Sequence, residues 1–272
     1  MITLLISIAI GCAAAGVAFV WLPWWAALPV GLVFFGGAQY AAGRILKSRL
    51  EAHMKRAQDI LLTGQKRLKH KMAQWQIRPP GSVRQAQLEI ERDQRVFIEK
   101  ALEEVKLLQP WEKWSPLLKK QTATMKLQLY WQLRDMREVD ALLPVALYMD
   151  PMSLAIRLAR QIMLDAPPEK LRKTFDKSVA RLRYNQSALL YAAYSWALVQ
   201  RKDLDAAHKI LLQACEKNEN ETLKRNKEAI ANNQPQKFSN AGFADEWYAL
   251  WLEEPPKPKT VRQQPPRGGR PF

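Results

Sequence analysis

The side chains that most often carry chemistry are few in this sequence, and they do not form a motif. Cys12 lies in an apolar stretch and Cys215 in a predicted helix, so the spacing favours neither a disulfide nor a CxxC metal pair. The histidines His53, His70 and His208 have no second ligand at a metal-binding spacing. We therefore predict no metal site and no cofactor.

The sequence also lacks the patterns of common catalytic sites. It contains no Gly-rich phosphate loop, no serine elbow and no helix with histidine and acidic residues at ligand spacing. Asp140, Asp150 and Asp165 fit turn and surface positions. We predict that the protein is not an enzyme, so its function must rest on binding.

The charge of the chain is concentrated in two segments. The net charge is +16, yet Met1–Gly43 contains no Lys, Arg, Asp or Glu. Residues 44–78 carry ten basic side chains against two acidic ones, and residues 255–272 carry five basic and none acidic. A basic pI often indicates nucleic-acid binding, but basic residues beside an apolar segment are typical of membrane topology and of attraction to anionic lipids.

The uncharged N-terminal segment predicts a two-helix membrane anchor over residues 1–43. Two apolar runs, 2–20 and 26–43, each approach the roughly 20 residues that a helix needs to cross a bilayer. Between them lie three tryptophans and a proline, a combination typical of a turn at the membrane interface. Small residues in both runs, including Gly36 and Gly37 in the second, predict a close approach of the two helices. A re-entrant hairpin or a cleaved signal sequence are the alternatives, although no basic residue precedes the first run.

The positions of the basic residues predict the orientation of this anchor. The positive-inside rule places the chain from Arg44 onward in the cytoplasm, and two spans return the N-terminus to the same side. We expect an integral protein of a bacterial-type inner or plasma membrane, with membrane lipids contacting residues 1–50. The predicted membrane-interface residues are Trp21, Trp24, Trp25, Arg44, Lys47 and Arg49.

A long basic amphipathic helix is predicted over residues 44–78. Apolar or small residues recur in steps of three and four from Leu46 to Trp75, which describes one helical stripe. Gly64 interrupts the large side chains of this stripe. Three interpretations are open: the stripe packs against the protein's own repeats, pairs with a second copy or another partner, or lies on the membrane surface.

The rest of the chain divides at proline-rich breaks. Residues 79–114 begin with Pro-Pro-Gly and predict an N-terminal capping helix from Ser82 and a connection rich in tryptophan. Residues 115–254 predict a helical repeat domain that ends in capping helices over about 220–232 and 241–253. Residues 255–272 contain no aliphatic residue beyond Val261 and predict a disordered, Pro-rich, basic tail.

An internal repeat gives the central domain its expected fold. The segments Asp135–Pro151 and Asp203–Ala214 both begin with an acidic turn and continue with small and apolar residues in matching positions. Small residues recur 34 residues apart at Ala146, Ala180 and Ala214, and large apolar ones at Tyr130, Leu164 and Leu198. This pattern over residues 118–219 resembles the tetratricopeptide repeat (TPR), whose unit has 34 residues and folds as a pair of helices.

The middle repeat departs from the family pattern. Lys173 and Lys177 stand where small and apolar residues are usual, and Pro167-Pro168 forms the turn. A generic array of helical hairpins is therefore the alternative. With the anchor and the basic helix, either reading predicts an all-α protein consisting of a transmembrane hairpin, a long helix and a TPR-like solenoid.

The resemblance implies that other proteins bind on the concave face formed by the first helix of each unit. The partner-binding residues that it implies are Gln128, Trp131, Leu158, Ile162, Trp196 and Val199. Much of this face is apolar, so it either accepts an apolar segment of a partner or is filled by a helix of the same chain.

These expectations lead to three functional hypotheses. The first is a membrane-anchored scaffold or adaptor that binds partner proteins on the cytoplasmic face, with a second copy of the chain among the partners considered. The second is a membrane-tethered protein that binds nucleic acid or ribosomes through its basic segments, which we favour less. The third is a lipid-active hairpin protein that shapes membranes.

Overall fold

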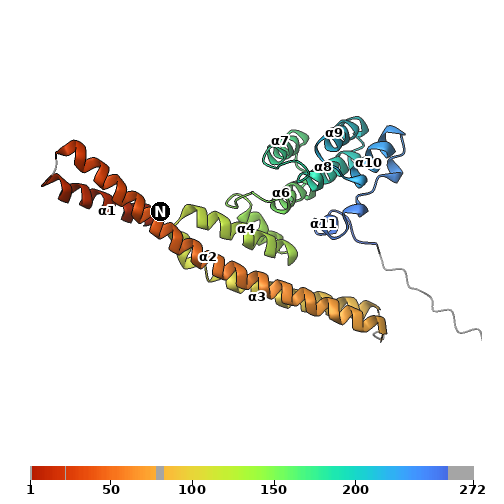
Figure 1. Cartoon of the computed structure of the whole chain (residues 1–272). Coiled ribbons are helices and arrows are strands. Elements are labelled where there is room, and N and C mark those ends of the chain that lie inside the picture. The colour runs from red at the N-terminus through yellow and green to blue at the C-terminus, as the bar shows by residue number, and fades with distance from the viewer. Residues whose placement is uncertain (1, 22, 78–82, 257–272) are drawn as a thin grey trace, which may run out of the picture. The chain divides into compact units, whose positions relative to one another are not determined.

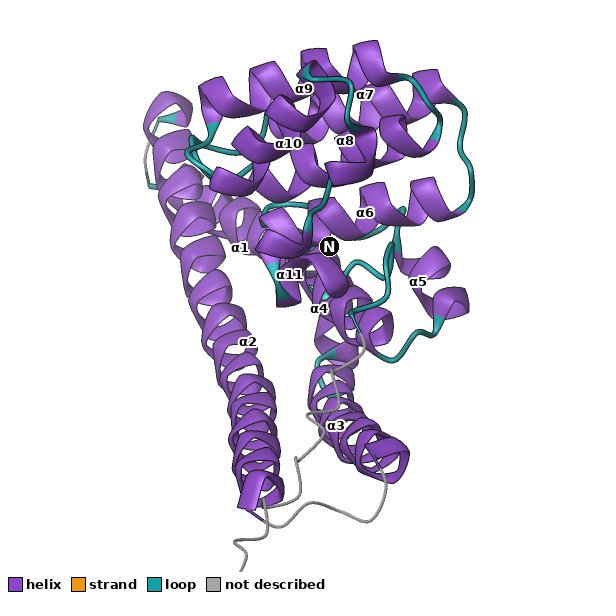
Figure 2. Cartoon of the chain, turned by 90° about the vertical axis from the view of Figure 1, so that its right-hand side faces the viewer, coloured by secondary structure: helices purple, strands orange, loops and turns teal. Residues whose placement is uncertain are grey.

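The computed structural model describes residues 2–21, 23–77 and 83–256, and these residues form helices and no strand (Figures 1 and 2). The Pro-Pro-Gly break and most of the predicted tail lie outside the described residues. The α-helices are α1 (Ile2–Phe19), α2 (Trp24–Ile77), α3 (Val83–Lys106), α4 (Pro116–Gln132), α5 (Met136–Leu142), α6 (Pro151–Met163), α7 (Pro168–Val179), α8 (Ala188–Gln200), α9 (Leu204–Lys217), α10 (Glu221–Ala231) and α11 (Asp245–Tyr248). Short 3-10 helices are η1 (Gln109–Lys113), η2 (Pro235–Lys237) and η3 (Ala241–Phe243).

The chain divides into two compact units, Met1–Ser153 and Leu154–Phe272. This boundary differs from the predicted one at residue 115. Helices α4 and α5 belong to the first unit because α4 packs against α3, whereas α7 to α11 form the second unit with most of α6.

Helix α1 packs against the first part of α2 through small residues. A Cβ atom added to Gly31 would lie 2.8 Å from the Cβ of Ala15 and 2.8 Å from the carbonyl oxygen of Gly11, so no larger residue fits there without a shift. The expected contribution of Gly36 and Gly37 is wrong, because a Cβ at either position would meet no atom within 4 Å. The close approach occurs at Gly31, five residues earlier than expected.

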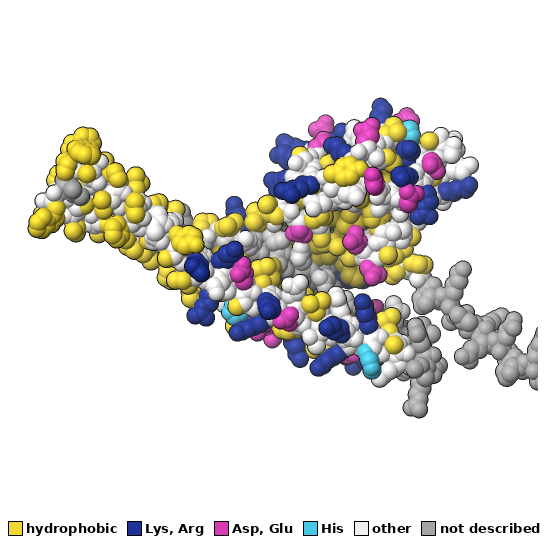
Figure 3. Space-filling view, in the orientation of Figure 1, with side chains coloured by type: hydrophobic (Ala, Val, Ile, Leu, Met, Phe, Trp, Pro, Cys, Tyr) yellow, Lys and Arg dark blue, Asp and Glu magenta, His cyan; other side chains and the backbone are white. Residues whose placement is uncertain are grey.

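Outside this contact, α1 and the start of α2 expose their apolar side chains. Both helices are long and apolar enough to cross a membrane by length and composition, and only 17% and 11% of their most apolar windows are buried. Leu5 is 65% exposed and Leu32 is 69% exposed. Figure 3 shows hydrophobic side chains covering this end of the first unit, whereas charged side chains are frequent on the rest of the molecule.

The second part of α2 buries its stripe against the helices that follow it. Leu46 and Leu50 form a core cluster with Leu108 and Leu118. Further along α2, Ala57 packs with residues of α3 and α4 in a second cluster (Ile98, Ala101, Leu102, Val105 and Leu129). The stripe therefore packs within the chain, mainly against α3, which precedes the predicted repeats, and in part against α4, which belongs to them.

A glycine allows the closest approach between α2 and α3. A Cβ atom at Gly64 would lie 2.5 Å from Cγ of Phe97, a distance that no real side chain accommodates. The aromatic ring of Phe97 therefore occupies the space that the missing side chain leaves. Ion pairs also join α2 to α3, since the Lys71 ammonium lies 2.6 Å from carboxylate oxygens of both Glu89 and Asp93.

The chain folds into three successive helix pairs whose turns share one geometry. The first helix of each pair ends with a residue in the left-handed region, namely Arg134 after α4, Asp165 after α6 and Lys202 after α8. The next amide in each case donates 3.0 Å to the carbonyl five residues earlier, which is the Schellman arrangement. The carbonyls are those of Tyr130, Gln161 and Leu198.

These turns give the spacing of the pairs. Tyr130 and Leu198 both accept the turn bond, and their separation of 68 residues is twice the predicted 34-residue unit. In the middle pair the residue that accepts this bond is Gln161 and not the predicted Leu164. Leu164 is instead 60% exposed. The prediction for the middle unit is therefore wrong by three residues, because α6 ends early and a longer connection precedes α8.

The second helices of the outer pairs begin with acidic caps, which lie in the predicted acidic turns. The Asp135 carboxylate accepts from the amide of Glu138 at 3.3 Å, and Asp203 accepts from Ala206 at 3.1 Å. Helix α5 ends at Leu142, so Ala146 lies in the following connection and not in a helix as its alignment with Ala214 implied.

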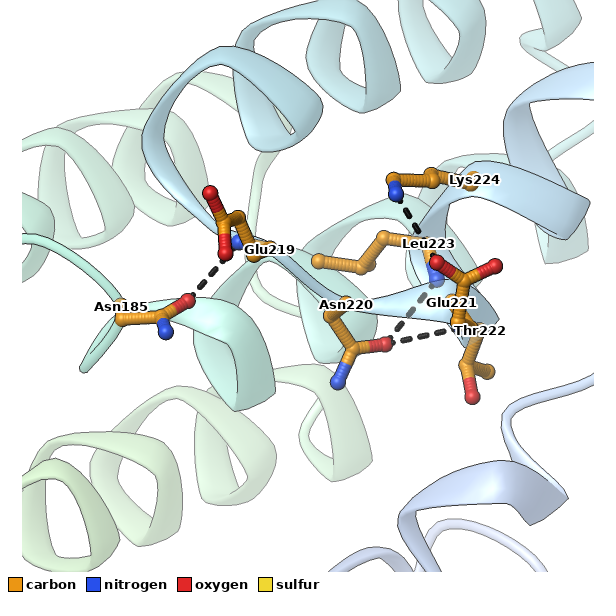
Figure 4. A network of polar contacts seen from close by, with 7 residues as sticks. All are labelled: Asn185, Glu219, Asn220, Glu221, Thr222, Leu223 and Lys224. Atoms are coloured by element: carbon orange, nitrogen blue, oxygen red, sulfur yellow. Dashed lines mark hydrogen bonds and ion pairs between the residues drawn. The ribbon is translucent and has the colours of Figure 1, made fainter.

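The connection between α9 and α10 is fixed by side-chain amides (Figure 4). The Asn185 side chain accepts from the Glu219 amide at 2.8 Å, which joins the segment before α8 to the end of α9. Asn220 caps α10 by accepting from the amides of Thr222 and Leu223 at 2.9 and 3.2 Å. The position of α10 follows from these bonds.

The final segment differs from the helix expected over 241–253. It contains η3 and the short helix α11, separated at Ala244, whose φ of 49° breaks the helical backbone. A Cβ at Gly242 would lie 2.0 Å from Oγ1 of Thr222, so η3 lies directly against α10. The Asn240 side chain, which is fully buried, donates to the carbonyl of Ala192 at 3.1 Å and thereby attaches the segment to α8.

Candidate partner-binding site

The candidate site of the second unit centres on Trp196 in α8. Its indole nitrogen donates to Oε1 of Glu253 at 2.7 Å, and the indole of Trp247 donates to Oε2 of the same carboxylate at 2.6 Å. The two rings meet nearly edge to face, with centroids 6.1 Å apart. One carboxylate thus fixes both tryptophans, and one side of Trp196 is covered by the chain's own C-terminal segment.

A cavity of about 380 Å³ lies beside Trp196. Ile162 and Trp196, both implied by the TPR resemblance, line it together with Trp251 and Leu252. Ile162 comes from α6 and Trp196 from α8, while the other two follow α11. The wall of the cavity therefore combines first helices of two successive pairs with the C-terminal segment.

Charged and polar groups stand at the edge of this cavity. The Arg201 guanidinium lies 2.7 Å from the carboxylate of Asp165 and donates to the carbonyl of Ala166 at 2.8 Å. Both charged residues belong to the turns after α6 and α8, so the repeated turn positions the ion pair. Gln200 is exposed and also lines the cavity. Aromatic, aliphatic and charged side chains therefore share the lining of this cavity.

The other implied residues do not line this cavity. Trp131 and Leu158 are 1% and 0% exposed, so these two side chains are part of the core and are not open anchors for a partner. Gln128 donates to the Asp150 carboxylate at 3.0 Å, and Asp150 also accepts from the Ser153 amide at the start of α6. Val199 is half-buried in α8.

The C-terminal part of the cavity was missed at the sequence level. Trp251 falls within the helix predicted over 241–253, yet its φ of 56° ends helical geometry and the residue lines the cavity. A left-handed tryptophan has no sequence signal. The carboxylate of Glu253, which follows two residues later, is the clearest missed element, because it is the acceptor that joins the two indoles.

Two buried tyrosines lie on the opposite side of α8. Phe175 of α7 stacks on Tyr194 with centroids 4.4 Å apart and meets the edge of Tyr191 at 5.1 Å. Burial raises the pKa of both tyrosines, so their phenols are neutral at physiological pH. These rings hold α7 against α8 and add no charge to the site.

The predicted interface residues of the first unit are all exposed. Trp21, Trp24 and Trp25 lie at the connection between α1 and α2, with 66–85% of each residue exposed. At the other end of the apolar part of α2, Arg44 and Lys47 are exposed, and the guanidinium carbon of Arg49 lies 5.9 Å from the ring centre of Trp111. Aromatic and basic residues therefore stand at the two ends of the apolar surface.

Metal chemistry finds no support among residues 2–21, 23–77 and 83–256, where no group of three His, Cys, Asp or Glu side chains is placed to hold an ion. Burial raises the pKa of the Cys215 thiol, which disfavours its reactive thiolate. The site around Trp196 consists of aromatic surface and an ion pair beside a cavity. Comparisons of the chain with family models, with curated proteins and with solved structures find no match.

Proposed function

We propose that this protein is a membrane-anchored scaffold that binds other proteins through its helix pairs on the cytoplasmic side. The observation that carries the proposal is the contrast within α2. Its first part exposes large apolar side chains such as Leu32 and Val33, whereas its second part buries an apolar stripe against α3. Burial of apolar surface stabilises in water, so exposure over a whole helix supports a lipid environment.

The proposed orientation rests on the start of α1. Thr3 donates from Oγ1 to the carbonyl of Trp114 at 2.9 Å, so the beginning of α1 lies beside the segment that leads into α4. Two antiparallel spans would return the chain to the side on which it began, and Arg44 follows the second span directly. Both observations favour a cytoplasmic location of α3 to α11.

The binding role rests on the repeated turns and on the cavity. Three helix pairs with one turn geometry support a TPR-like array, in which first helices face a partner. The cavity beside Trp196 lies on two such helices, and we propose that it receives an apolar side chain of the partner.

Extraction of membranes with alkaline carbonate tests the anchor. We expect the full chain to remain in the membrane pellet. Release into the supernatant contradicts the proposal, since peripheral proteins are removed by this treatment.

Site-specific photocrosslinking in cells tests the binding role. A crosslinking amino acid at Gln200, which is exposed and lines the cavity, is expected to capture a partner protein. The matched position is Leu212 of α9, which is 43% exposed in the same unit and does not line the cavity. Equal capture at the two positions contradicts the assignment of the site. Capture at Gln200 that is unchanged by Ile162→Asp contradicts it as well.

A further inference from the structure

A second cavity lies within the first unit, where α1, α2 and the start of α4 come together. Its volume is about 280 Å³. The residues that line it include Leu4 and Leu5 of α1, Gly43 and Leu46 of α2, and Ser115 and Pro116 at the start of α4. It is therefore built from three segments that are far apart in the sequence.

The cavity stands at the boundary between the apolar and the charged parts of the chain. Gly43 is the last residue of the uncharged segment, and Arg44 is the first charged residue. Leu4 and Leu5 line the cavity and are 49% and 65% exposed, so the cavity continues onto the exposed apolar surface of α1. In a bilayer, this surface faces acyl chains, and the charged boundary lies at the headgroups.

The charge beside the cavity is positive. Arg44 and Lys47 adjoin the lining residues Gly43 and Leu46, and both are exposed. Lys119 is also exposed and lies one helical turn after Ser115. The first acidic residue of the chain, Glu51, is 3.6 Å from Lys47 in an exposed pair, which water and salt weaken.

The nearest acidic residue of the connection before α4 is already paired. Glu112 accepts from the Lys126 ammonium and from the Thr122 hydroxyl at 2.8 and 2.9 Å. None of the residues that line the cavity is acidic. An apolar cavity next to exposed basic residues matches an amphiphile with an acyl chain and an anionic headgroup.

We propose that this cavity binds one anionic phospholipid from the surrounding membrane. One acyl chain lies between Leu5 and Leu46, and the phosphate lies at Arg44 and Lys47. This inference rests on the proposed membrane anchor. It adds a specific lipid to that anchor, and the lipid would join α1, α2 and α4 at the membrane surface.

Native mass spectrometry of the full chain released from detergent tests this site. The probes are phosphatidylglycerol and phosphatidylcholine with identical acyl chains. We expect retention of one phosphatidylglycerol in preference to phosphatidylcholine. Arg44→Gln is expected to reduce that retention about fivefold, the usual contribution of one basic residue at an anionic surface.

A glycine substitution tests the acyl part of the site. Gly43 lines the cavity and a Cβ there would meet no atom within 4 Å, so Gly43→Leu adds a large side chain beside the cavity without an immediate clash. We expect retention to fall about tenfold, as when two methylene groups are no longer buried. The matched control is Gly36→Leu, because a Cβ there also meets no atom within 4 Å and Gly36 does not line the cavity.

Two results would overturn the proposed lipid site: equal retention of the two lipids, and equal retention by Gly43→Leu and Gly36→Leu. Carbonate extraction distinguishes failure of the lipid site from failure of the proposed membrane anchor. A chain that leaves the membrane in carbonate disproves the anchor and the lipid site together. A chain that stays in the membrane but shows no lipid preference disproves the lipid site alone.

Discussion

The two parts of α2 form one continuous helix but differ in the burial of their apolar side chains. From Trp24 to Gly43 the helix has no charged residue, and apart from its contact with α1 it exposes large apolar side chains. From Arg44 to Ile77 it is amphipathic and its apolar stripe packs against other helices. Helix propensity alone does not distinguish the two parts. The distribution of apolar residues around the helix does, because a helix that packs on one face concentrates its apolar residues there.

The largest expected effect comes from a charge in the first part. Leu32→Asp places a carboxylate near the middle of the proposed span, at a cost of about 3 kcal/mol in membrane insertion. Leu62→Asp is the matched change in the second part, where Leu62 is 45% exposed, and we expect normal insertion. The fraction of chain inserted into membrane vesicles during cell-free synthesis measures both. Equal insertion of the two variants would contradict the expected difference between the two parts of α2.

Truncation of a leucine is expected to destabilise the protein in the second part of α2 and not in the first. Leu50 is 7% exposed and packs with Leu108 and Leu118, so Leu50→Ala removes buried contacts at a cost of about 2.5 kcal/mol. Leu32→Ala changes an exposed side chain and is expected to leave unfolding in detergent unchanged. Thermal unfolding of the full chain, followed by circular dichroism, measures the difference. A lower melting temperature for Leu32→Ala than for Leu50→Ala would contradict it.

Substitutions of two glycines test the difference in packing between the two parts of α2. Gly64→Leu forces a side chain into Phe97, and we expect a loss of about 2 kcal/mol through overpacking. Gly36→Leu meets no neighbouring atom and is expected to cause no loss. The same unfolding measurement applies. If Gly64→Leu stabilises the protein as a simple gain in helix propensity would, the close contact between α2 and α3 is wrong.

The smallest effect is expected on the water-facing side of α3. Arg95 and Glu99 are 2.8 Å apart one turn from each other and are well exposed, so Arg95→Gln should cost about 0.3 kcal/mol. A double-mutant cycle with Glu99→Gln measures the pair directly. A coupling above about 1 kcal/mol would contradict the small contribution expected of this exposed pair.

Local patterns predicted much of the fold. The spacing of Leu46, Leu50 and Ala57 predicted the stripe that packs on α3 and α4. The carboxylates of Asp135 and Asp203 cap their helices as the turn pattern suggested. These features depend on residues within a few turns of one another, so they are visible in a single sequence.

Features that depend on distant residues were not predicted. The small-residue contact falls on Gly31 rather than Gly36, because the crossing of two helices depends on both of them. The turn after α6 comes three residues before the place that the 34-residue spacing implied. At the candidate site, the implied residues Ile162 and Trp196 do line one cavity, but Trp131 is core and Glu253 was missed.

The bond between Thr3 and Trp114 has a consequence for the order of assembly during translation. Ribosomes add roughly 5–20 residues per second, so Thr3 waits on the order of ten seconds for a partner that is synthesised 111 residues later. The stripe from Leu46 to Leu61 also emerges before α3 exists to cover it. In that interval the nearest apolar phase for the nascent helix is the bilayer that the proposed anchor enters.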